Sequence, residues 1–456
     1  MNFEMINSGP IRQLLNVISV MRLSVFLLLC FVLGGTSQDI VGPKLFLYLI
    51  SLVVIGACLT TINSDSAIWK VKGLLILFGT FLLGHLLYLI PLPAGVWSNL
   101  PGRDFIVKGY EILGVELPWL PLSVTPEKTL FSLFDFLPPF ALLLLLGTVV
   151  KTHEIKMAIK TIGVFVIISV IMGILQVANI HDGLYIYDFT NTKSAVGFFS
   201  NANHYGVFML MSIPLIMCII DFSIVDYVDY NRALTFSIIC IVAALLGIGL
   251  CGSLGSFLLI LPVLAGTGFI WSTSLRRKKF YLIGILGSLI AVFLFDIFIW
   301  ENLQQDILSK LTSVDSSVRQ TLFEKSAEIA KTFFPVGTGP GSFADVYKLF
   351  EDVGRKTIPH AHNDYIEMFV EFGILGPVWI ICAFIWIGRN ILKALTHQKE
   401  SQKMSQYLSI SIMIVFVHSI FDYSLRTISV MTLLVFCLSI LSLSNQKAGF
   451  QEGESL

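Results

Sequence analysis

Charged residues are scarce in this chain. Asp, Glu, Lys and Arg make up 13% of its 456 residues, whereas hydrophobic residues make up 55% and the mean hydropathy is +0.82. Soluble globular proteins carry about 25% charged residues, so this composition excludes a chain that folds in water and predicts one that folds in lipid. The formal net charge is zero, which provides no overall field to attract nucleic acid or an acidic partner.

The chain also lacks two common kinds of ligand motif. Its seven cysteines lie in or beside apolar runs without CxxC spacing, which predicts small core residues and neither a disulfide framework nor a metal site. The glycine-rich GTGPGSF at 337–343 lacks the Gly-Lys-Ser/Thr ending of a phosphate-binding loop, so no nucleotide site is expected there. We expect neither a metal nor another cofactor.

Long apolar runs dominate the sequence, and a helix of roughly 20 apolar residues crosses a bilayer core. They predict an all-α polytopic integral membrane protein, a single membrane domain over 1–456 with about 12 transmembrane helices. The predicted spans are 16–35, 44–61, 71–91, 128–150, 157–178, 203–221, 233–251, 254–274, 280–300, 365–388, 405–423 and 426–444. Only Gly252 and Ser253 separate the seventh span from the eighth, which predicts a tight hairpin.

Lysine and arginine set the predicted orientation, because they concentrate on the cytoplasmic side of membrane proteins. With a cytoplasmic N-terminus, 17 of the 30 basic residues fall on that side, and seven of the other 13 lie in one long loop that the rule discounts. Both termini are then cytoplasmic, and three longer connections face the periplasm. These are 92–127, 179–202 and the large loop 301–364.

The large periplasmic loop is predicted to contain a helix. Its segment SSVRQTLFEKSAEIAKTFFP, 316–335, repeats apolar residues at helical spacing, so we expect an amphipathic helix on the surface of the membrane domain. The residues of the apolar stripe are Val318, Leu322, Ile329 and Phe333.

The same loop ends in HAHNDYIEMFVEFGILG, 360–376, which opens the tenth span. Asp364 and Glu367 form an Asp-x-x-Glu helix start, so the tenth helix is predicted to begin near Asp364. The positive helix end disfavours imidazolium, so we expect His362 to be neutral and able to accept a proton. Glu367 and Glu371 share a face with Asp364 that cannot point into lipid and should line a wet cleft or the bundle interior.

A plain structural role stays open for this segment, which could be a capped helix that enters the membrane. We favour that interpretation for His360. For His362 and Asn363, together with the two glutamates, we favour a functional role.

Polar residues inside other predicted spans also need partners. His85 is interpreted as a buried, hydrogen-bonded structural residue, whereas Asp135 and Asp296 are interior polar groups without an assigned role.

Two further groups lie at the predicted periplasmic ends of spans. His418 and Asp422 share a helix face, and they could bond each other, or Asp422 could pair with Arg426; structural and site-supporting roles are equally open. The start of the sixth span could be a helix cap or could line the cleft that His362 faces. Its polar residues are Asn201, Asn203 and His204.

Four segments together resemble the O-antigen ligase superfamily, which holds O-antigen ligases, O-antigen and exopolysaccharide polymerases and bacterial protein O-oligosaccharyltransferases. The first has the spacing His-Asn, nine residues, Gly-x-x-Gly, at His362, Asn363, Gly373 and Gly376. The other segments are VGFFSNANHYGVFMLMSIPL (196–215), VRQTLFEKSAEIAKTFFPVGTGPGSF (318–343) and HSIFDYSLR (418–426). The resemblance extends over about residues 120 to 445.

The resemblance implies a metal-independent, inverting glycosyl transfer at the periplasmic face of the bacterial inner membrane, in cell-surface polysaccharide biosynthesis. The implied donor is an oligosaccharide on undecaprenyl diphosphate. His362 matches a histidine proposed as general base, and Arg319 matches an arginine proposed to hold the diphosphate. Residues expected to bind substrate are Asn363, Glu367, Glu371, Asn201, Asn203, His204 and Arg426.

The chain departs from the family at one turn. Family members often carry Ser-Arg-Gly between the seventh and eighth spans, where this chain has Leu254. Lys193, Arg426 or Lys348 could supply the missing contact.

The acceptor stays open between lipid A core, for a ligase, and the next lipid-linked repeat, for a polymerase. A protein acceptor is disfavoured, because the chain stops about a dozen residues after the last span. Twelve spans with both termini inside also fit a transporter, although no paired broken spans indicate the repeat symmetry of that class. For an enzyme, we expect Arg319 and His362 to meet at one lateral, lipid-accessible cleft near the outer membrane plane. A central midplane cavity would favour transport.

Overall fold

The computed structural model describes residues 9–38, 41–63, 66–148, 152–178, 182–222, 227–272, 315–351, 359–396 and 403–447. Within these ranges, 9 helices are long and apolar enough to cross a membrane, and the strands amount to one short pair. The chain is therefore an all-α polytopic membrane protein. The ninth predicted span, 280–300, and Asp296 lie outside the described residues.

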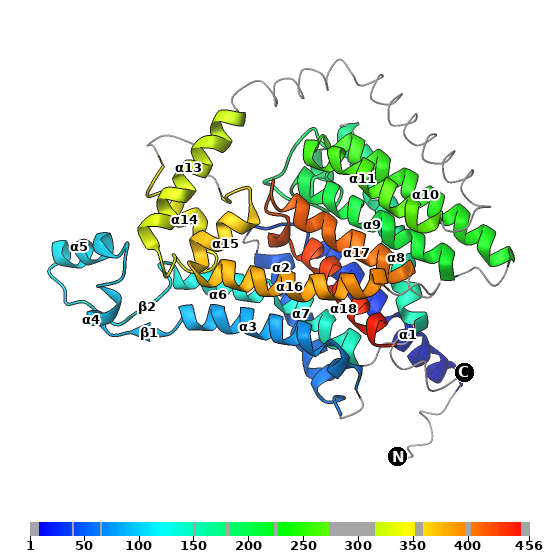
Figure 1. Cartoon of the computed structure of the whole chain (residues 1–456), viewed down its shortest axis with the longest axis horizontal. Coiled ribbons are helices and arrows are strands. Elements are labelled where there is room, and N and C mark those ends of the chain that lie inside the picture. Colours follow the sequence, from blue (N-terminus) through cyan, green and yellow to red (C-terminus); the bar gives the residue numbers. More distant parts are fainter. Residues whose placement is uncertain are drawn as a thin grey trace.

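Seventeen α-helices, with three short 3-10 helices and one strand pair, make up the described chain (Figure 1). The α-helices are α1 Gly9–Leu33, α2 Val41–Leu59, α3 Lys72–Tyr88, α4 Ala94–Trp97, α5 Asp104–Leu113, α6 Pro126–Phe134, α7 Leu137–Thr148, α8 Thr152–Val177, α9 Ala202–Phe222, α10 Tyr227–Cys251, α11 Leu254–Trp271, α13 Asp315–Phe333, α14 Phe343–Tyr347, α15 Asp364–Phe372, α16 Leu375–Thr396, α17 Lys403–His418 and α18 Ile428–Lys447. The remaining elements are η2 Ala67–Val71, η3 Asp182–Leu184, η5 Ser424–Arg426, β1 Pro91–Leu92 and β2 Leu120–Pro121.

The predicted spans agree with most of these helices. The 9 long apolar helices coincide with the second to eighth, tenth and twelfth predicted spans. The first corresponds to α1, whose apolar part Met21–Leu33 is shorter, and the eleventh to α17, which has 16 residues. The tight hairpin is confirmed, because Gly252 has a φ of +68° between α10 and α11 and Ser253 caps α11. The total number of spans stays a prediction.

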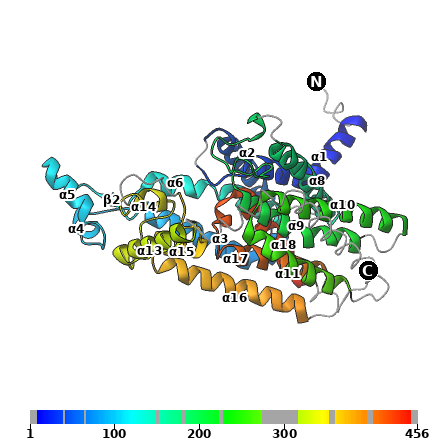
Figure 2. The ribbon, with the colours of Figure 1, turned by 90° about the horizontal axis from the view of Figure 1, so that it is seen from above.

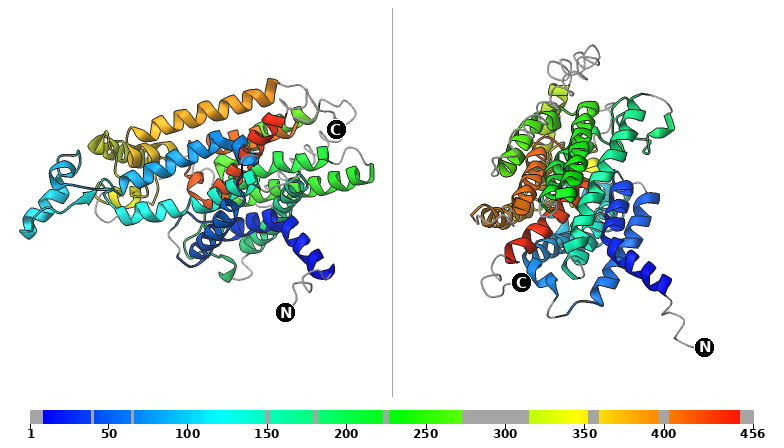
Figure 3. Two further views of the ribbon diagram at one scale, coloured as in Figure 1. Left: turned by 90° about the horizontal axis from the view of Figure 1, so that it is seen from below. Right: turned by 90° about the vertical axis from the view of Figure 1, so that its right-hand side faces the viewer.

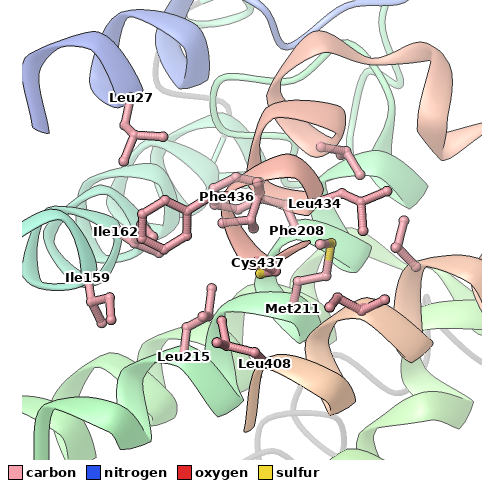
Figure 4. Close-up of a cluster of buried hydrophobic side chains, with 14 of the residues drawn as sticks. Leu27, Ile159, Ile162, Phe208, Met211, Leu215, Leu408, Leu434, Phe436 and Cys437 are labelled. Atoms are coloured by element: carbon pink, nitrogen blue, oxygen red, sulfur yellow. The ribbon is translucent and has the colours of Figure 1, made fainter. Parts of the chain in front are cut away.

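Helix α9 forms the centre of the bundle. Within its apolar window, 94% of the residues are buried, and it packs against α8, α10, α11, α17 and α18. Figure 4 shows Phe208, Met211 and Leu215 of α9 beside Leu408 of α17 and Phe436 of α18. Lipid tails are as apolar as these side chains, so close van der Waals packing between helices provides the stabilisation. A rigid central helix therefore carries the polar residues at its start.

The connections predicted to be periplasmic gather at one end of the bundle. Ser200 N donates to Gly35 O at 3.0 Å, and Val124 N donates to Thr338 O at 2.8 Å, so loops far apart in sequence meet there. The arm formed by α4, α5 and the strand pair projects from this end, and α13, α14 and α15 lie beside it (Figures 1 and 2). Helix α1 begins toward the opposite end (Figure 3).

The tenth span differs from its prediction. A helix does begin at Asp364, but it ends at Phe372, and the membrane-crossing helix is Leu375–Thr396. Gly373 breaks the chain with a φ of +54°, and a Cβ there would lie 2.0 Å from the Pro335 carbonyl oxygen. The predicted continuous helix over 365–388 is therefore wrong, because close backbone contact with the loop at Pro335 requires a glycine and a turn.

The glycine-rich segment forms part of that contact. Thr338 N donates to Val370 O at 3.1 Å and Gly339 N donates to Glu371 O at 2.9 Å, so the turn closes the C-terminal end of α15. The predicted amphipathic helix of the large loop is α13, which packs against α15. Its stripe is buried at Leu322, Ile329 and Phe333, whereas the side chain of Val318 lies outside the described residues.

Two of the polar residues predicted inside spans have partners. His85 is buried, and its Nδ1–H donates to the Phe81 carbonyl at 3.0 Å, which confirms a hydrogen-bonded buried histidine. Asp135 lies at the break between α6 and α7, where Lys44 Nζ is 3.0 Å away and the Tyr48 hydroxyl donates to the same carboxylate. Asp135 therefore joins α2 to the α6–α7 break.

Replacing Gly373 with alanine is expected to destabilise the protein by at least about 2 kcal/mol. The added Cβ would collide with the Pro335 carbonyl, and alanine disfavours the positive φ. The measurement is the Tm of the purified protein in detergent.

Gly388→Ala provides the matched control on α16. A Cβ at Gly388 meets no other atom within 4 Å in the described part of the chain, so its Tm should stay unchanged or rise. Equal Tm values for the two variants would contradict the close contact at Gly373.

Candidate functional site

The polar residues of the site come from four places in the sequence. The start of α9, the end of α17, η5 and the start of α15 meet at the end of the bundle that also holds the long connections. Asn363 caps α15, because its Oδ1 accepts from Tyr365 N at 2.9 Å and Ile366 N at 3.0 Å while its amide donates to Ile420 O at 2.8 Å. These bonds fix the loop that carries His362.

His362 is held in an unusual conformation next to a buried carboxylate. Its φ is +49°, a left-handed backbone conformation that non-glycine residues rarely adopt outside functional sites and turns. Its Nδ1–H donates to Asp422 Oδ1 at 3.1 Å, and the same oxygen accepts from Tyr423 N at 2.9 Å. Asp422 is 1% exposed and His362 is 33% exposed. The carboxylate therefore orients an imidazole that remains accessible.

His360 forms a second histidine–carboxylate pair beside the first. Its Nδ1–H donates to Glu367 Oε1 at 2.9 Å, and Ala361 N donates to the other oxygen of Glu367 at 2.9 Å. The ring of His360 stacks on Tyr423 with centroids 4.0 Å apart, and His362 contacts Tyr423 edge-on at 4.9 Å. Tyr423 thus lies between the two pairs. The sequence interpretation gave His360 and Tyr423 no functional role, although His360 stands two positions from His362.

Three carboxylates of α15 surround one guanidinium. Arg426 Nη2 is 2.7 Å from Glu371 Oε2, and Arg426 Nε is 3.6 Å from Glu367 and 4.0 Å from Asp364. All three carboxylates are buried, which confirms that this face turns away from lipid. One cation is insufficient to balance three buried anions, so the cluster must also bind protons.

Proton binding differs among the three carboxylates. Burial raises the pKa of Glu371 to about 7 and that of Asp364 to about 7, although the Arg426 guanidinium opposes both shifts. Burial alone would also raise the pKa of Glu367, but the nearby Arg426 guanidinium and His360 outweigh the effect of burial and lower the pKa of Glu367 to about 2. Glu367 is thus an anion at neutral pH, whereas Glu371 and Asp364 exchange protons near it.

A polar cleft of about 360 Å³ opens at this cluster. His360, Glu367, Glu371 and Arg426 form part of its lining, and Lys128, Asp135 and Lys348 also contribute. Of the cations predicted to replace the one absent at Leu254, Arg426 and Lys348 therefore reach the cleft. Lys348 pairs with Asp345 at 2.9 Å in a partly exposed contact. Breaking such an ion pair costs little free energy, so Lys348 is available to contact a ligand in the cleft.

Residues at the start of α9 contact Tyr423 and Asp422 of the site. Asn201 Oδ1 accepts from Asn203 N at 2.8 Å as a helix cap, and its amide donates to the Tyr423 hydroxyl at 3.1 Å. His204 is fully buried, bonds Thr427 through Nδ1 at 2.6 Å, and has Nε2 4.0 Å from Asp422. Asn201 therefore both caps the helix and contacts the site, whereas Asn203 contributes its backbone N–H.

The partners of Asp422 and Arg426 differ from both predicted alternatives. His418 bonds Ser424 at 2.8 Å and Ser256 at 3.3 Å, Asp422 pairs with His362, and Arg426 pairs with the acids of α15. The spacing of four along one helix suggested local pairing, but α17 ends at His418, so Asp422 lies in the following turn.

Arg319 lies within α13, and its side chain is outside the described residues. The helix places its backbone on the element that packs against α15. The predicted meeting of Arg319 with His362 stays a prediction.

The proton on Glu371 should make stability depend on pH. An ordinary glutamate titrates near 4.5, and burial raises the pKa of Glu371 to about 7, so the folded state holds the proton more tightly than the unfolded chain does. This contribution is fully present below pH 4.5 and is lost as the pH rises through about 7. The Tm in detergent should therefore fall less between pH 5 and 8 in Glu371→Gln, which resembles the protonated acid, than in the wild type. Identical slopes would contradict a proton held at Glu371.

A comparison with protein families bears on this geometry. The family model described as O-antigen ligase matches residues 239–381. This range includes the segment of His362 and Asn363, the α15–α16 break and the helix of Arg319. No curated protein matches the chain. This multi-pass membrane protein is thus similar to the O-antigen ligase family over residues 239–381, a region that contains the His-Asn and Gly-x-x-Gly positions.

Proposed function

We propose that the chain is a membrane glycosyltransferase of the O-antigen ligase or polymerase type. It moves an oligosaccharide from undecaprenyl diphosphate to a hydroxyl of a glycan or of lipid A core, at the periplasmic face of the bacterial inner membrane. The observation that carries the proposal is the pair of His362 with buried Asp422. His362 does not line the polar cleft, but it contacts Tyr423, and so does His360, which lines the cleft together with Arg426. The family match over 239–381 supports the same reaction class.

His362 acts as the general base. Its Nδ1–H is committed to Asp422, so in the neutral ring Nε2 carries the lone pair that can accept the proton of an acceptor hydroxyl. The acceptor oxygen attacks the anomeric carbon of the donor as the bond from that carbon to the diphosphate oxygen breaks. The bonding electrons leave with the polyprenyl diphosphate, and the anomeric configuration inverts. Asp422 stabilises the imidazolium that forms.

The cleft provides the contacts for sugar and diphosphate. A planar guanidinium suits a pair of phosphate oxygens, which supports roles for Arg426 in the cleft and for Arg319 on α13. Glu367, an anion that lines the cleft, can accept hydrogen bonds from sugar hydroxyls, and Glu371 can accept or donate according to its proton. The other residues expected to bind substrate act indirectly. Asn363 caps α15, Asn201 bonds Tyr423, and His204 lies near Asp422. Asn203 contributes only its backbone N–H, which caps the start of α9.

The place of the cleft favours the enzyme over the transporter. The cleft lies among the loops and helix starts at one end of the bundle, where the predicted periplasmic connections meet. The excess of lysine and arginine on the other side supports a periplasmic orientation for this end.

The general base is tested in membrane vesicles that contain the protein and a lipid-linked oligosaccharide donor. His362→Ala should lower the rate of transfer by at least about 100-fold, because general-base catalysis contributes roughly that much. Asp422→Asn should lower kcat and leave the KM for the donor unchanged, because Asp422 acts through His362. Lys325→Ala, at a partly exposed lysine of α13 that pairs with Glu328, is the control and should retain full activity. Full activity of His362→Ala would remove His362 from the mechanism.

The acceptor is tested in a deletion strain that carries the wild-type gene or the His362→Ala variant. Gel analysis of the surface glycan separates the two branches. A ligase variant should lose long chains on lipid A and retain lipid-linked polymer, whereas a polymerase variant should lose chain length itself. Unchanged glycans in the variant would contradict both.

A further inference from the structure

One aromatic ring of the polar cleft is open to solvent. Phe189 lines the cleft and is 66% exposed, whereas Phe343, another ring of the lining, is buried and Phe136 is half-buried. Phenyl surface in contact with water is unfavourable, and a ligand that covers the ring removes that cost. Within a cleft that is otherwise rich in polar groups, Phe189 therefore provides an apolar face for part of a ligand.

The loop that carries Phe189 is fixed on both sides of this residue. Two positions earlier, Tyr187 is buried. Two positions later, Asn191 Oδ1 accepts from Ala202 N at 2.9 Å, and Asn191 N donates to Ser200 O at 3.3 Å. These bonds tie the loop to the start of α9. The ring is thus presented to the cleft by an anchored segment, so a ligand need not spend binding energy on ordering it.

Polar and charged side chains make up much of the remaining lining. Glu367 is an anion that accepts hydrogen bonds, Ser132 carries a hydroxyl, and Lys348 donates through its ammonium group. A ligand that suits this cleft has polar groups around its edge and one apolar face. A pyranose ring has this form, because its hydroxyls project around the ring while axial C–H bonds gather on a face. The negative π face of an aromatic ring attracts the weakly positive hydrogens of those bonds.

We propose that Phe189 stacks against a pyranose ring of the donor oligosaccharide, on a face that carries axial C–H bonds. The proposal rests on the proposed function and adds a residue that helps to select the transferred sugar. The sugar covers Phe189 with this face, and Glu367 and Lys348 bond its hydroxyls. An axial hydroxyl on the stacked face would lie against the phenyl ring without a hydrogen-bond partner, so sugars that carry one there are disfavoured.

Binding of the donor tests the stacked ring. The probe is lipid-linked oligosaccharide extracted from membranes of the deletion strain, and its affinity is measured for the full chain in lipid nanodiscs. Phe189→Ala should weaken binding by about tenfold, since the contact energy of a covered aromatic face is of that order. Phe189→Tyr, which keeps the ring, should bind as the wild type does. Ile186→Ala is the matched control, because Ile186 is an exposed apolar residue of the same loop outside the cleft lining, and it should also bind normally.

Undecaprenyl diphosphate without a sugar separates the glycan from its carrier. Phe189→Ala should bind this lipid as tightly as the wild type does. Equal weakening for both lipids would indicate contact with the carrier, or a general loss of structure, and would overturn the proposal. Wild-type affinity of Phe189→Ala for the lipid-linked oligosaccharide would overturn it as well.

His362→Ala separates the two proposals. It should lose transfer, and adding Phe189→Ala to it should still weaken binding of the lipid-linked oligosaccharide. An inactive His362→Ala together with unchanged donor binding by Phe189→Ala would remove the stacked sugar and leave the proposed function. A fully active His362→Ala would remove the proposed function, and a wild-type chain that does not bind the donor would remove both.

Discussion

The single guanidinium of Arg426 is the interaction on which the site depends. Burying three carboxylates on the first turns of α15 is costly, and an ion pair that loses one buried partner costs about 3–5 kcal/mol, against at most about 1 kcal/mol at the surface. Arg426 joins η5 to all three, and the protons held near neutral pH remove part of the remaining charge. Charge therefore helps to fix the position of α15 against the α17–α18 turn, in a bundle whose core is packed mainly from apolar side chains.

The geometry of His362 follows from that arrangement. The loop before α15 is fixed on one side by Glu367, which accepts from Ala361 N and His360, and on the other by the Asn363 cap. Between these two supports the chain adopts a left-handed conformation at His362 and brings its ring to Asp422. Strain of about 1–3 kcal/mol is tolerable there because the surrounding bonds determine the conformation. The His362 ring is thus positioned by hydrogen-bonded contacts on both sides of the residue.

Most of the fold could be predicted from sequence, and the site only in part. Apolar runs predict the membrane helices, because a helix must present about 20 apolar residues to cross a bilayer, and local sequence also predicts the helix start near Asp364. The break at Gly373 could not be predicted from local sequence. A glycine that allows close helix packing and a glycine that ends a helix look the same in sequence, and here the distant Pro335 carbonyl decides between them. The pairing of His362 with Asp422 could not be predicted either, because the two residues are 60 positions apart in sequence. His418, four positions from Asp422, was the nearer candidate, but it bonds Ser424. Arg426 was expected to bind substrate, which stays a prediction, and its pairing with the carboxylates of α15 was not foreseen.

A membrane enzyme that acts on an amphiphile must let two solvents meet at a fixed point. In this chain an apolar groove of about 140 Å³ between α3, α15, α16 and α18 has Arg426 in common with the polar cleft, and the same residue pairs with the acids of α15. Arg426, which pairs with the buried acids, therefore also lies where an apolar space meets a polar one. An anionic group that arrives there competes with Glu371 and Asp364 for the guanidinium, and both carboxyls can answer by taking up protons, since their pKa values are about 7. Under the proposed function, binding of an anionic head group is therefore expected to be linked to proton uptake by the cluster, which would keep the buried charge balanced.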